Sequence, residues 1–466
     1  MKSAEVYKHG DKRATLKRFW LPLLLGLPLA GVVLVATQPN LQSWIESSTG
    51  QGLDPRYHYR FQRPSQGSIT LALNKEIDFY RERLRFDPDS GLNRALLAQS
   101  YIKMARATGE TSWYLLAEQT AQQSLAKLPF NNKGAKLALA RVATAKHDFP
   151  EAIRLAEQVQ GHEDNLAILA TANLAMGETA KANQAAETLV KQAPSLGSLT
   201  LQALVKVASG KDQEAIQIFQ QALAAEEPEE TGSSVWTRTL LGRLYFKRGQ
   251  LKLARQLYQE SLRVLPHYPP ALLNLAELEI RQGNYAAAER LYSKFFVISQ
   301  RSPTVYDHVI LRGMARVKEL QGDLGEARKW RDAAEVRLRQ DLTSFGHRRE
   351  LARLLLERDR PEDAQEALSL MQAELTIRHD AETLDTFAWA LMRLGRWQDA
   401  QQAMQKALQG GVRDPGLFYR ASQIEQALGN QQQAIAFTKR VQETDPTFDQ
   451  KAQQALGLGV GLLGLN

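Results

Sequence analysis

Residues 236–266 read WTRTLLGRLYFKRGQLKLARQLYQESLRVLP, and this stretch decides the fold. Two of its residues, Gly249 and Tyr258, recur 34 residues later as Gly283 and Tyr292. A fixed period of this length is typical of proteins built as a stack of similar small units. We therefore expect a repeat array, in which each unit packs mainly on its neighbours, rather than several independent domains.

The quoted stretch has the pattern of two helices joined by a tight turn. Leu241 and Tyr245 lie four residues apart and therefore share one face of the first helix. Gly242 carries no side chain and lets the two helices approach closely. Gly249 supplies the turn, and Pro266 stops the second helix because proline lacks the backbone donor.

The stretch resembles one unit of the tetratricopeptide repeat (TPR), and further units resemble it in phase. The matching residues are Leu169, Ala170, Gly177, Ala182 and Pro194 in one unit; Ala203, Gly210, Ala215, Phe219 and Ala222 in the next; Ala315, Gly322 and Ala327; Leu351, Ala352 and Ala364; Phe387, Ala388, Leu391, Gly395, Ala400 and Ala407; and Ala421, Gly429, Ala434 and Pro446. Asp359 replaces the turn glycine in one unit. Two earlier stretches, near residues 92–129 and 131–160, resemble the repeat more weakly.

The resemblance implies an all-α fold, a right-handed superhelical solenoid of about ten helix pairs. The first helix of each pair would line a concave inner groove. Members of this family bind peptides, extended segments or other subunits, and the repeat is not catalytic by itself.

An uncharged apolar run lies near the N-terminus. Residues 20–37 read WLPLLLGLPLAGVVLVAT, which as a helix would span about 27 Å, close to the ~30 Å hydrocarbon core of a bilayer. Its two prolines are tolerated in membrane spans. The positive-inside rule places the preceding basic flank in the cytoplasm. That flank carries Lys2, Lys8, Lys12, Arg13, Lys17 and Arg18.

These signals predict five segments. Residues 1–18 form a cytoplasmic basic tail, and residues 19–37 form one transmembrane helix preceding the solenoid. Residues 38–66, rich in Gln, Ser, Gly and Pro, form a linker. Residues 67–446 form the solenoid with an N-terminal capping helix, and residues 447–466 form a C-terminal capping helix and a Gly/Leu-rich tail. We expect a single-pass protein of the bacterial inner membrane, with the TPR domain in the periplasm or an equivalent lumen.

Two other interpretations of the N-terminal run stay open. A cleaved signal peptide would release a soluble exported chaperone, and the best cleavage position follows Ala36. Leu34 would then occupy the −3 position, where a small residue is preferred. The third interpretation is a helix buried in a soluble fold.

The net charge of +8 is concentrated near the N-terminus. Residues 1–18 carry a charge of +4 and residues 54–86 carry +3, so the rest of the chain is close to neutral. A nucleic-acid-binding protein should carry a broad basic face over its folded body. We therefore expect no nucleic-acid partner.

The sequence has no recognisable catalytic or metal-binding motif. There are no cysteines, and the eight histidines are scattered without the spacing of metal ligands. The C-terminal run 456–466, LGLGVGLLGLN, contains a literal GxGxxG, but no strand precedes it and no helix follows. We therefore expect no enzyme activity, no metal and no cofactor. The histidines are His9, His58, His147, His162, His267, His308, His347 and His379.

Arginines occupy positions that the resemblance places in the groove. One unit has Arg312 and Arg316, and the next has Arg349 and Arg353. Each pair shares one helix face because its members are four residues apart. Arg243 occupies a similar position two units earlier. Guanidinium groups along a concave surface suit the carboxylates of an acidic partner.

Trp236 and Trp389 fall near the same positions and are candidate anchors for a partner. Core packing explains the two tryptophans equally well, and a solvated face crossed by ordinary ion pairs explains the arginines. Glu277 and Glu319 lie nearby in the repeat and could form such pairs.

Together these features predict a membrane-anchored TPR scaffold. It would mediate protein–protein interaction, or assembly of an envelope or membrane complex, and its protein partners would include acidic segments. The alternative is a recognition subunit that binds an acidic peptide or polysaccharide in the concave groove. The sequence gives no signal for the oligomeric state.

Overall fold

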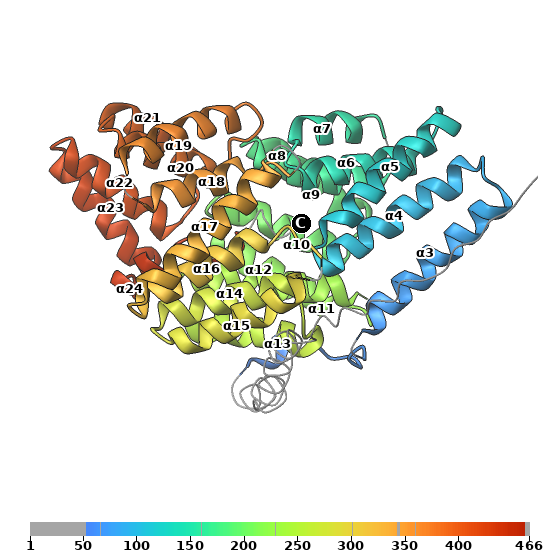
Figure 1. Ribbon diagram of the computed structural model, residues 1–466, viewed down its shortest axis with the longest axis horizontal. Coiled ribbons are helices and arrows are strands. Elements are labelled where there is room, and N and C mark those ends of the chain that lie inside the picture. The colour runs from blue at the N-terminus through green and yellow to red at the C-terminus, as the bar shows by residue number, and fades with distance from the viewer. Residues whose placement is uncertain are drawn as a thin grey trace, which may run out of the picture. The chain divides into compact units, whose positions relative to one another are not determined.

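The computed structural model describes residues 53–65, 67–159, 161–228, 230–300, 302–342, 345–358 and 360–461. These residues form a succession of α-helices (Figure 1). The elements are η1 (Pro55–Tyr57), a short 3-10 helix, followed by α3 (Ser68–Phe86), α4 (Gly91–Thr108), α5 (Thr111–Lys127), α6 (Lys133–Ala145), α7 (Phe149–Glu157), α8 (Glu163–Ala175), α9 (Thr179–Gln192), α10 (Leu196–Ala208), α11 (Asp212–Ala224), α12 (Thr231–Lys247), α13 (Leu251–Val264), α14 (Pro269–Arg281), α15 (Tyr285–Ser299), α16 (Asp307–Leu320), α17 (Leu324–Asp341), α18 (Arg348–Leu356), α19 (Pro361–Glu374), α20 (Ala381–Arg393), α21 (Trp397–Gln409), α22 (Pro415–Ala427), α23 (Gln431–Thr444) and α24 (Gln450–Gln454).

The helices are arranged in pairs. Within the described part of the chain, ten pairs run from α4/α5 to α22/α23, and the two helices of each pair pack together more extensively than either packs on other elements. Helix α3 packs on α4 at the start of the array. The all-helical repeat solenoid expected from the 34-residue period is confirmed.

The turn inside each pair has a recurring geometry. After α12, Gly249 N donates to Phe246 O (3.1 Å) and Gln250 N donates to Tyr245 O (3.0 Å). This is a Schellman motif, which requires a left-handed residue just past the helix. Glycine holds this position, with φ between 70° and 84°, at Gly177, Gly210, Gly249, Gly283, Gly322, Gly395 and Gly429.

Glycines inside helices allow close packing of aromatic rings. A Cβ on Gly242 would lie 2.7 Å from the ring of Tyr258, and a Cβ on Gly313 would lie 2.2 Å from the ring of Tyr292. Both tyrosines are fully buried. The predicted role of Gly242 in close helix approach is therefore confirmed, and Gly313 plays the same role between adjacent pairs.

Parts of the solenoid that are distant in sequence touch each other. Thr111 N, at the start of α5, donates to Pro303 O (3.0 Å), although the residues are 192 positions apart. His379 N, just before α20, donates to Ala175 O at the end of α8 (2.8 Å; Figure 1). The seventh pair, α16/α17, thus returns to the first, and later pairs lie against earlier ones.

These long-range contacts include both backbone and charged groups. A Cβ on Gly210 would lie 2.0 Å from Gly411 O, so the two backbones are in direct contact. Arg281 Nη2 lies 2.5 Å from Asp445 Oδ2, and both side chains are buried. An array that closes on itself in this way can shield its inner surface from water.

The segment predicted as a linker, residues 38–66, is described only in its last part, and that part packs on the repeats. Tyr57 and Tyr59 are buried. Tyr57 Oη lies 2.9 Å from Tyr245 Oη, and Tyr59 N donates to Glu260 Oε1 (2.7 Å). The linker prediction is wrong for these residues, because burial of two aromatic rings offsets the flexibility that the Gln, Ser, Gly and Pro content suggests.

The C-terminal region also differs from expectation. The capping helix expected within residues 447–466 is only α24, five residues long. Beyond α24 the chain enters the interior of the solenoid, as set out below.

Among the described residues, no helix is both long and apolar enough to cross a bilayer. The predicted span, residues 19–37, lies outside the described residues.

Gly210→Ala and Gly429→Ala test the contact between distant repeats. Both glycines have positive φ, 71° and 79°, but a Cβ on Gly429 would meet nothing within 4 Å. Gly429→Ala should lower the free energy of unfolding by about 1 kcal/mol through left-handed strain alone. Gly210→Ala should cost roughly 2 kcal/mol more because its methyl group displaces the Gly411 backbone. Urea unfolding of the full chain measures both, and equal losses would contradict a stabilising contact at Gly210.

Candidate binding cavity

The inner faces of the repeats surround a cavity of about 1000 Å³. Side chains from α6, α8, α10, α12, α14, α16, α18, α20 and α22 line it, so the first helix of each of these pairs faces inward. The structure brings all seven predicted groove residues to this wall. They are Trp236, Arg243, Arg312, Arg316, Arg349, Arg353 and Trp389.

The wall is not simply basic. Twelve Lys or Arg residues line it beside nine Asp or Glu residues, which leaves a modest positive excess. Three of the predicted arginines are nearly fully buried and already paired, so their first role is to hold neighbouring helices together. The pairs are Arg243 with Glu277, Arg312 with Glu357 (2.6 Å) and Arg349 with Asp380 (3.5 Å).

Arg316 and Arg353 are less completely balanced. Arg316 Nη1 lies 2.8 Å from Glu319 Oε2, and its side chain keeps 23% of its exposure. Arg353 Nε donates to Thr386 Oγ1 (3.1 Å). Burial and the nearby charge of Arg349 both lower the pKa of Arg353. These two guanidinium groups are best placed to receive an anionic group from a ligand.

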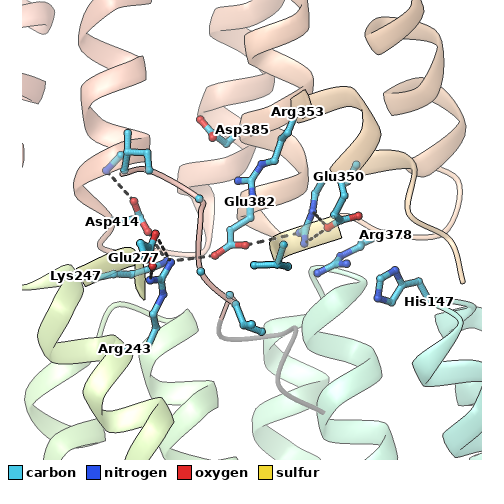
Figure 2. Close-up of a pocket in the computed structure, with 18 of the residues that line it drawn as sticks. His147, Arg243, Lys247, Glu277, Glu350, Arg353, Arg378, Glu382, Asp385 and Asp414 are labelled. Carbon is cyan, nitrogen blue, oxygen red and sulfur yellow. Dashed lines mark hydrogen bonds and ion pairs between the residues drawn. The ribbon is translucent and has the colours of Figure 1, made fainter. Parts of the chain in front are cut away.

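Glu382 lies at the centre of the charged wall (Figure 2). Lys247 Nζ lies 3.2 Å from Glu382 Oε1, and Arg349 Nη1 lies 3.8 Å from Glu382 Oε2. Burial raises the pKa of Glu382, but the surrounding cations outweigh burial and hold the pKa well below its usual range. Lys247 also lies 2.6 Å from Asp414 Oδ2, so this group joins α12 to both α20 and α22.

The two tryptophans differ in their surroundings. Trp236 is buried at the wall, with 8% of its surface exposed. Trp389 is half-buried, and the guanidinium of Arg420 stacks over its ring at 4.6 Å. A cation–π contact of this kind helps to fix the ring, which also packs against the hydrophobic core of the later repeats.

Several buried donors at the wall have no acceptor among the described residues. They belong to four side chains on α12, α14 and α16, and each is an N–H group. A buried donor without an acceptor costs roughly 1–3 kcal/mol. These four side chains therefore retain hydrogen-bonding capacity that the described residues do not use. The donors are Trp236 Nε1, Arg243 Nε, Asn274 Nδ2 and Arg312 Nε.

The cavity already holds part of the chain itself. After α24, residues 457–461 pass along the inner faces of α14 to α16. Asn274 Oδ1 accepts from Val460 N (2.7 Å), and Tyr292 Oη donates to Leu458 O (3.2 Å). A Cβ on Gly459 would lie 2.5 Å from Asn274 Oδ1, so only glycine fits there. The glycine-rich sequence of the tail permits this close approach. From the sequence the run could be rejected as a nucleotide-binding motif, but its packing inside the solenoid was not predicted.

The fold also gathers histidines that are scattered in the sequence. His147 and His347 have ring centroids 5.9 Å apart, and His308 lies 4.6 Å from His347. All three line the cavity with Glu350. They are 39 to 200 residues apart in the chain, so no local spacing could predict the cluster.

The comparisons with known families agree with the repeat geometry. The model of the MalT-like TPR region matches residues 134–412, which is more than half of the chain. The chain belongs to the MalT-like TPR family. A second model, of the tetratricopeptide repeat, matches residues 386–447. TPR proteins act as protein-binding scaffolds, and neither matching family is an enzyme family.

Two curated relatives share short stretches with this TPR chain. Uncharacterized protein ycf37 of Pyropia yezoensis is 34% identical over 65 residues, 14% of this chain and 36% of the relative. Uncharacterized protein ycf37 of Porphyra purpurea is 32% identical over 83 residues, 18% of this chain and 48% of the relative. The chain thus spans less than half the length of these relatives.

One solved structure is similar along most of the chain. The crystal structure of the APC/C hetero-tetramer Cut9–Hcn1 covers 92% of this chain and 99% of its own, at 13% identity. Its TM-score is 0.37, and we draw no argument from a likeness at that score.

Glu382→Gln tests how much the stability of the TPR array depends on its central carboxylate. At pH 7 the variant should lose roughly 2–4 kcal/mol of unfolding free energy, because buried cations lose their partner. The pKa of folded Glu382 is lowered, so this contribution is complete above the ordinary glutamate pKa and disappears as pH falls toward the folded value. The difference in unfolding free energy between the variant and the wild type, measured with urea, should therefore be smaller at lower pH than at pH 7.

Glu362→Gln is the matched control, since the Glu362 side chain is 71% exposed and pairs only loosely with Arg360 (3.8 Å). It should change the unfolding free energy by less than about 0.5 kcal/mol. If the loss of unfolding free energy in Glu382→Gln stays constant with pH, the charge of the Glu382 carboxylate has no role in stability.

Proposed function

We propose that the chain is a membrane-anchored TPR scaffold that holds an extended, acidic segment of a protein partner in its inner cavity. Protein binding is the common activity of the family to which the chain belongs. The acidic character of the partner, the membrane anchor and a role in assembling an envelope complex are our inferences.

The observation that carries this proposal is the set of buried N–H donors at the wall that lack acceptors. Three of the four side chains, Trp236, Arg243 and Arg312, line the cavity. Peptide carbonyls and carboxylates would satisfy these donors and recover the free energy that their burial costs. Because the site is shielded from water, such hydrogen bonds are stronger there than on an open surface.

The tail gives an internal example of how the wall can hold an extended backbone. Asn274 and Tyr292 bind main-chain groups of Val460 and Leu458 rather than side chains. Arg312 Nη1 donates to Gly457 O (3.3 Å) in the same way. A partner segment would extend along the wall toward Arg316 and Arg353 or compete with the tail.

The double variant Arg316→Gln with Arg353→Gln tests the acidic partner. The partner is first identified by crosslinking in native membranes and mass spectrometry. The variant should weaken its binding by at least about tenfold, because two charge-assisted hydrogen bonds are lost. Arg339→Gln is the control, since Arg339 on α17 pairs with Glu335 and Glu366 outside the cavity lining.

The two variants should also differ in salt dependence. Added salt should weaken wild-type binding more than binding of the cavity variant. Equal affinity of both variants for every partner would refute the acidic-partner proposal. Retention of an acidic polysaccharide by the purified chain alone would instead favour the alternative of a carbohydrate-recognition subunit.

The membrane proposal rests on the sequence of residues 20–37 and the six basic residues before it. Protease added outside intact spheroplasts should digest the TPR domain. Residues 1–18 should stay intact, because the membrane separates them from the protease. Inverted inner-membrane vesicles should show the opposite pattern. Protection of the TPR domain in spheroplasts would refute the orientation, and a mature N-terminus near residue 37 would show a cleaved signal.

A further inference from the structure

His147 stands at a backbone position that glycine holds in most other repeats. His147 N donates to Thr144 O (3.1 Å) and Asp148 N donates to Ala143 O (2.8 Å), which is the Schellman geometry of the glycine turns. Its φ is +61°, a left-handed value that costs a side-chain-bearing residue about 1–2 kcal/mol. Within the described residues only one other non-glycine residue, Asn131, has positive φ. We therefore expect the imidazole to make an interaction at this turn that offsets the backbone strain.

The strained turn places His147 against a distant repeat. A Cβ on Gly346 would lie 2.7 Å from Lys146 O and 3.1 Å from His147 Cβ, so the two backbones meet closely. His147 Nδ1 lies 3.3 Å from Gly346 O. The Nδ1–H group then donates to that carbonyl and leaves Nε2 as an electron-pair donor, the arrangement that orients metal-binding histidines.

Three candidate ligand atoms converge at this junction. One atom each from His147, His347 and Glu350 lies within 4.8 Å of the other two. The ring of His308 is centred 4.6 Å from that of His347, which brings a third imidazole next to these atoms. His308, His347 and Glu350 are each more than nine-tenths buried.

Glu350 is already held as a ligand would be. Its Oε1 accepts from Arg349 Nε (3.1 Å) and Nη2 (2.9 Å). Its Oε2 is buried and has no hydrogen-bond partner. The ion pair with Arg349 (2.9 Å) favours the charged form of the carboxylate. An ionised, buried oxygen without a partner is a costly feature that a cation would relieve.

Two arginine side chains, Arg349 and Arg378, lie near this cluster. The nearby cations Arg349 and Arg378 are themselves paired with Asp380, which limits their repulsion of a bound ion.

We propose that His147, His347, Glu350 and His308 bind one Zn²⁺ ion at the junction between α6/α7 and α16–α18. Nitrogen and carboxylate oxygen in this number match the tetrahedral preference of zinc. With bonds of about 2.0–2.1 Å, tetrahedral ligand atoms lie about 3.4 Å apart, so the side chains must close in slightly from the observed separation. The cavity gives the ion its route of entry, since all four residues line it.

The site would fasten two parts of the solenoid that lie 199 residues apart. His147 comes from the turn after α6, whereas His347 and Glu350 come from the start of α18. Binding that requires the folded junction stabilises it by linkage. The inference does not depend on the proposed partner, because the ion would act on closure of the array.

The test uses the full-length chain, without a histidine tag, purified in mild detergent and stripped of metal. Zn²⁺ titration should give one ion per chain and a higher melting temperature. Co²⁺ should give the intense visible bands of a tetrahedral site. His147→Gly and Glu350→Gln should each weaken Zn²⁺ binding by at least about 100-fold and abolish the thermal shift.

Loss of Zn²⁺ binding in His147→Gly cannot be attributed to misfolding, because glycine suits the left-handed turn. Without metal this variant should melt at or above the wild-type temperature. His379→Ala, which removes an exposed histidine outside the cluster, should bind Zn²⁺ as wild type does. Failure of the wild type to bind stoichiometric Zn²⁺, or unchanged affinity in His147→Gly and Glu350→Gln, would overturn the proposal.

Discussion

Direct contact between backbones about one superhelical turn apart is the constraint on which the cavity depends. At Gly210 and Gly411 the approach is too close for any side chain. It is reinforced by the buried pair of Arg281 and Asp445. If this contact were absent, the first helices would line an open groove. Because it is present, their inner side chains surround a cavity.

Shielding changes what the charged residues do. Arg243, Arg312 and Arg349 would be solvated on an open groove, but here each is buried with a carboxylate partner. The wall is therefore a network centred on Glu382 (Figure 2), in which removal of one charge leaves others uncompensated. The same shielding strengthens any hydrogen bond that a ligand makes with the remaining donors.

Much of the fold could be predicted because the repeat is local. Gly249 and Gly283 occupy the same turn geometry since the same nearby backbone groups bond there. The inward position of Arg312 and Arg316 was implied by the resemblance to the repeat, and their four-residue spacing places both on one helix face. The docking of Tyr57 had no such signal, because its partner Tyr245 is 188 residues away.

The sequence by itself determined the helix pairs, their turns and the set of side chains that face inward, because each depends on residues within one 34-residue unit or its neighbour. Only the tertiary structure decided that the inner faces surround one cavity, that residues 457–461 enter it, and that His147 meets His347 and Glu350. Those outcomes depend on how small rotations between successive pairs accumulate, and no single unit encodes that sum.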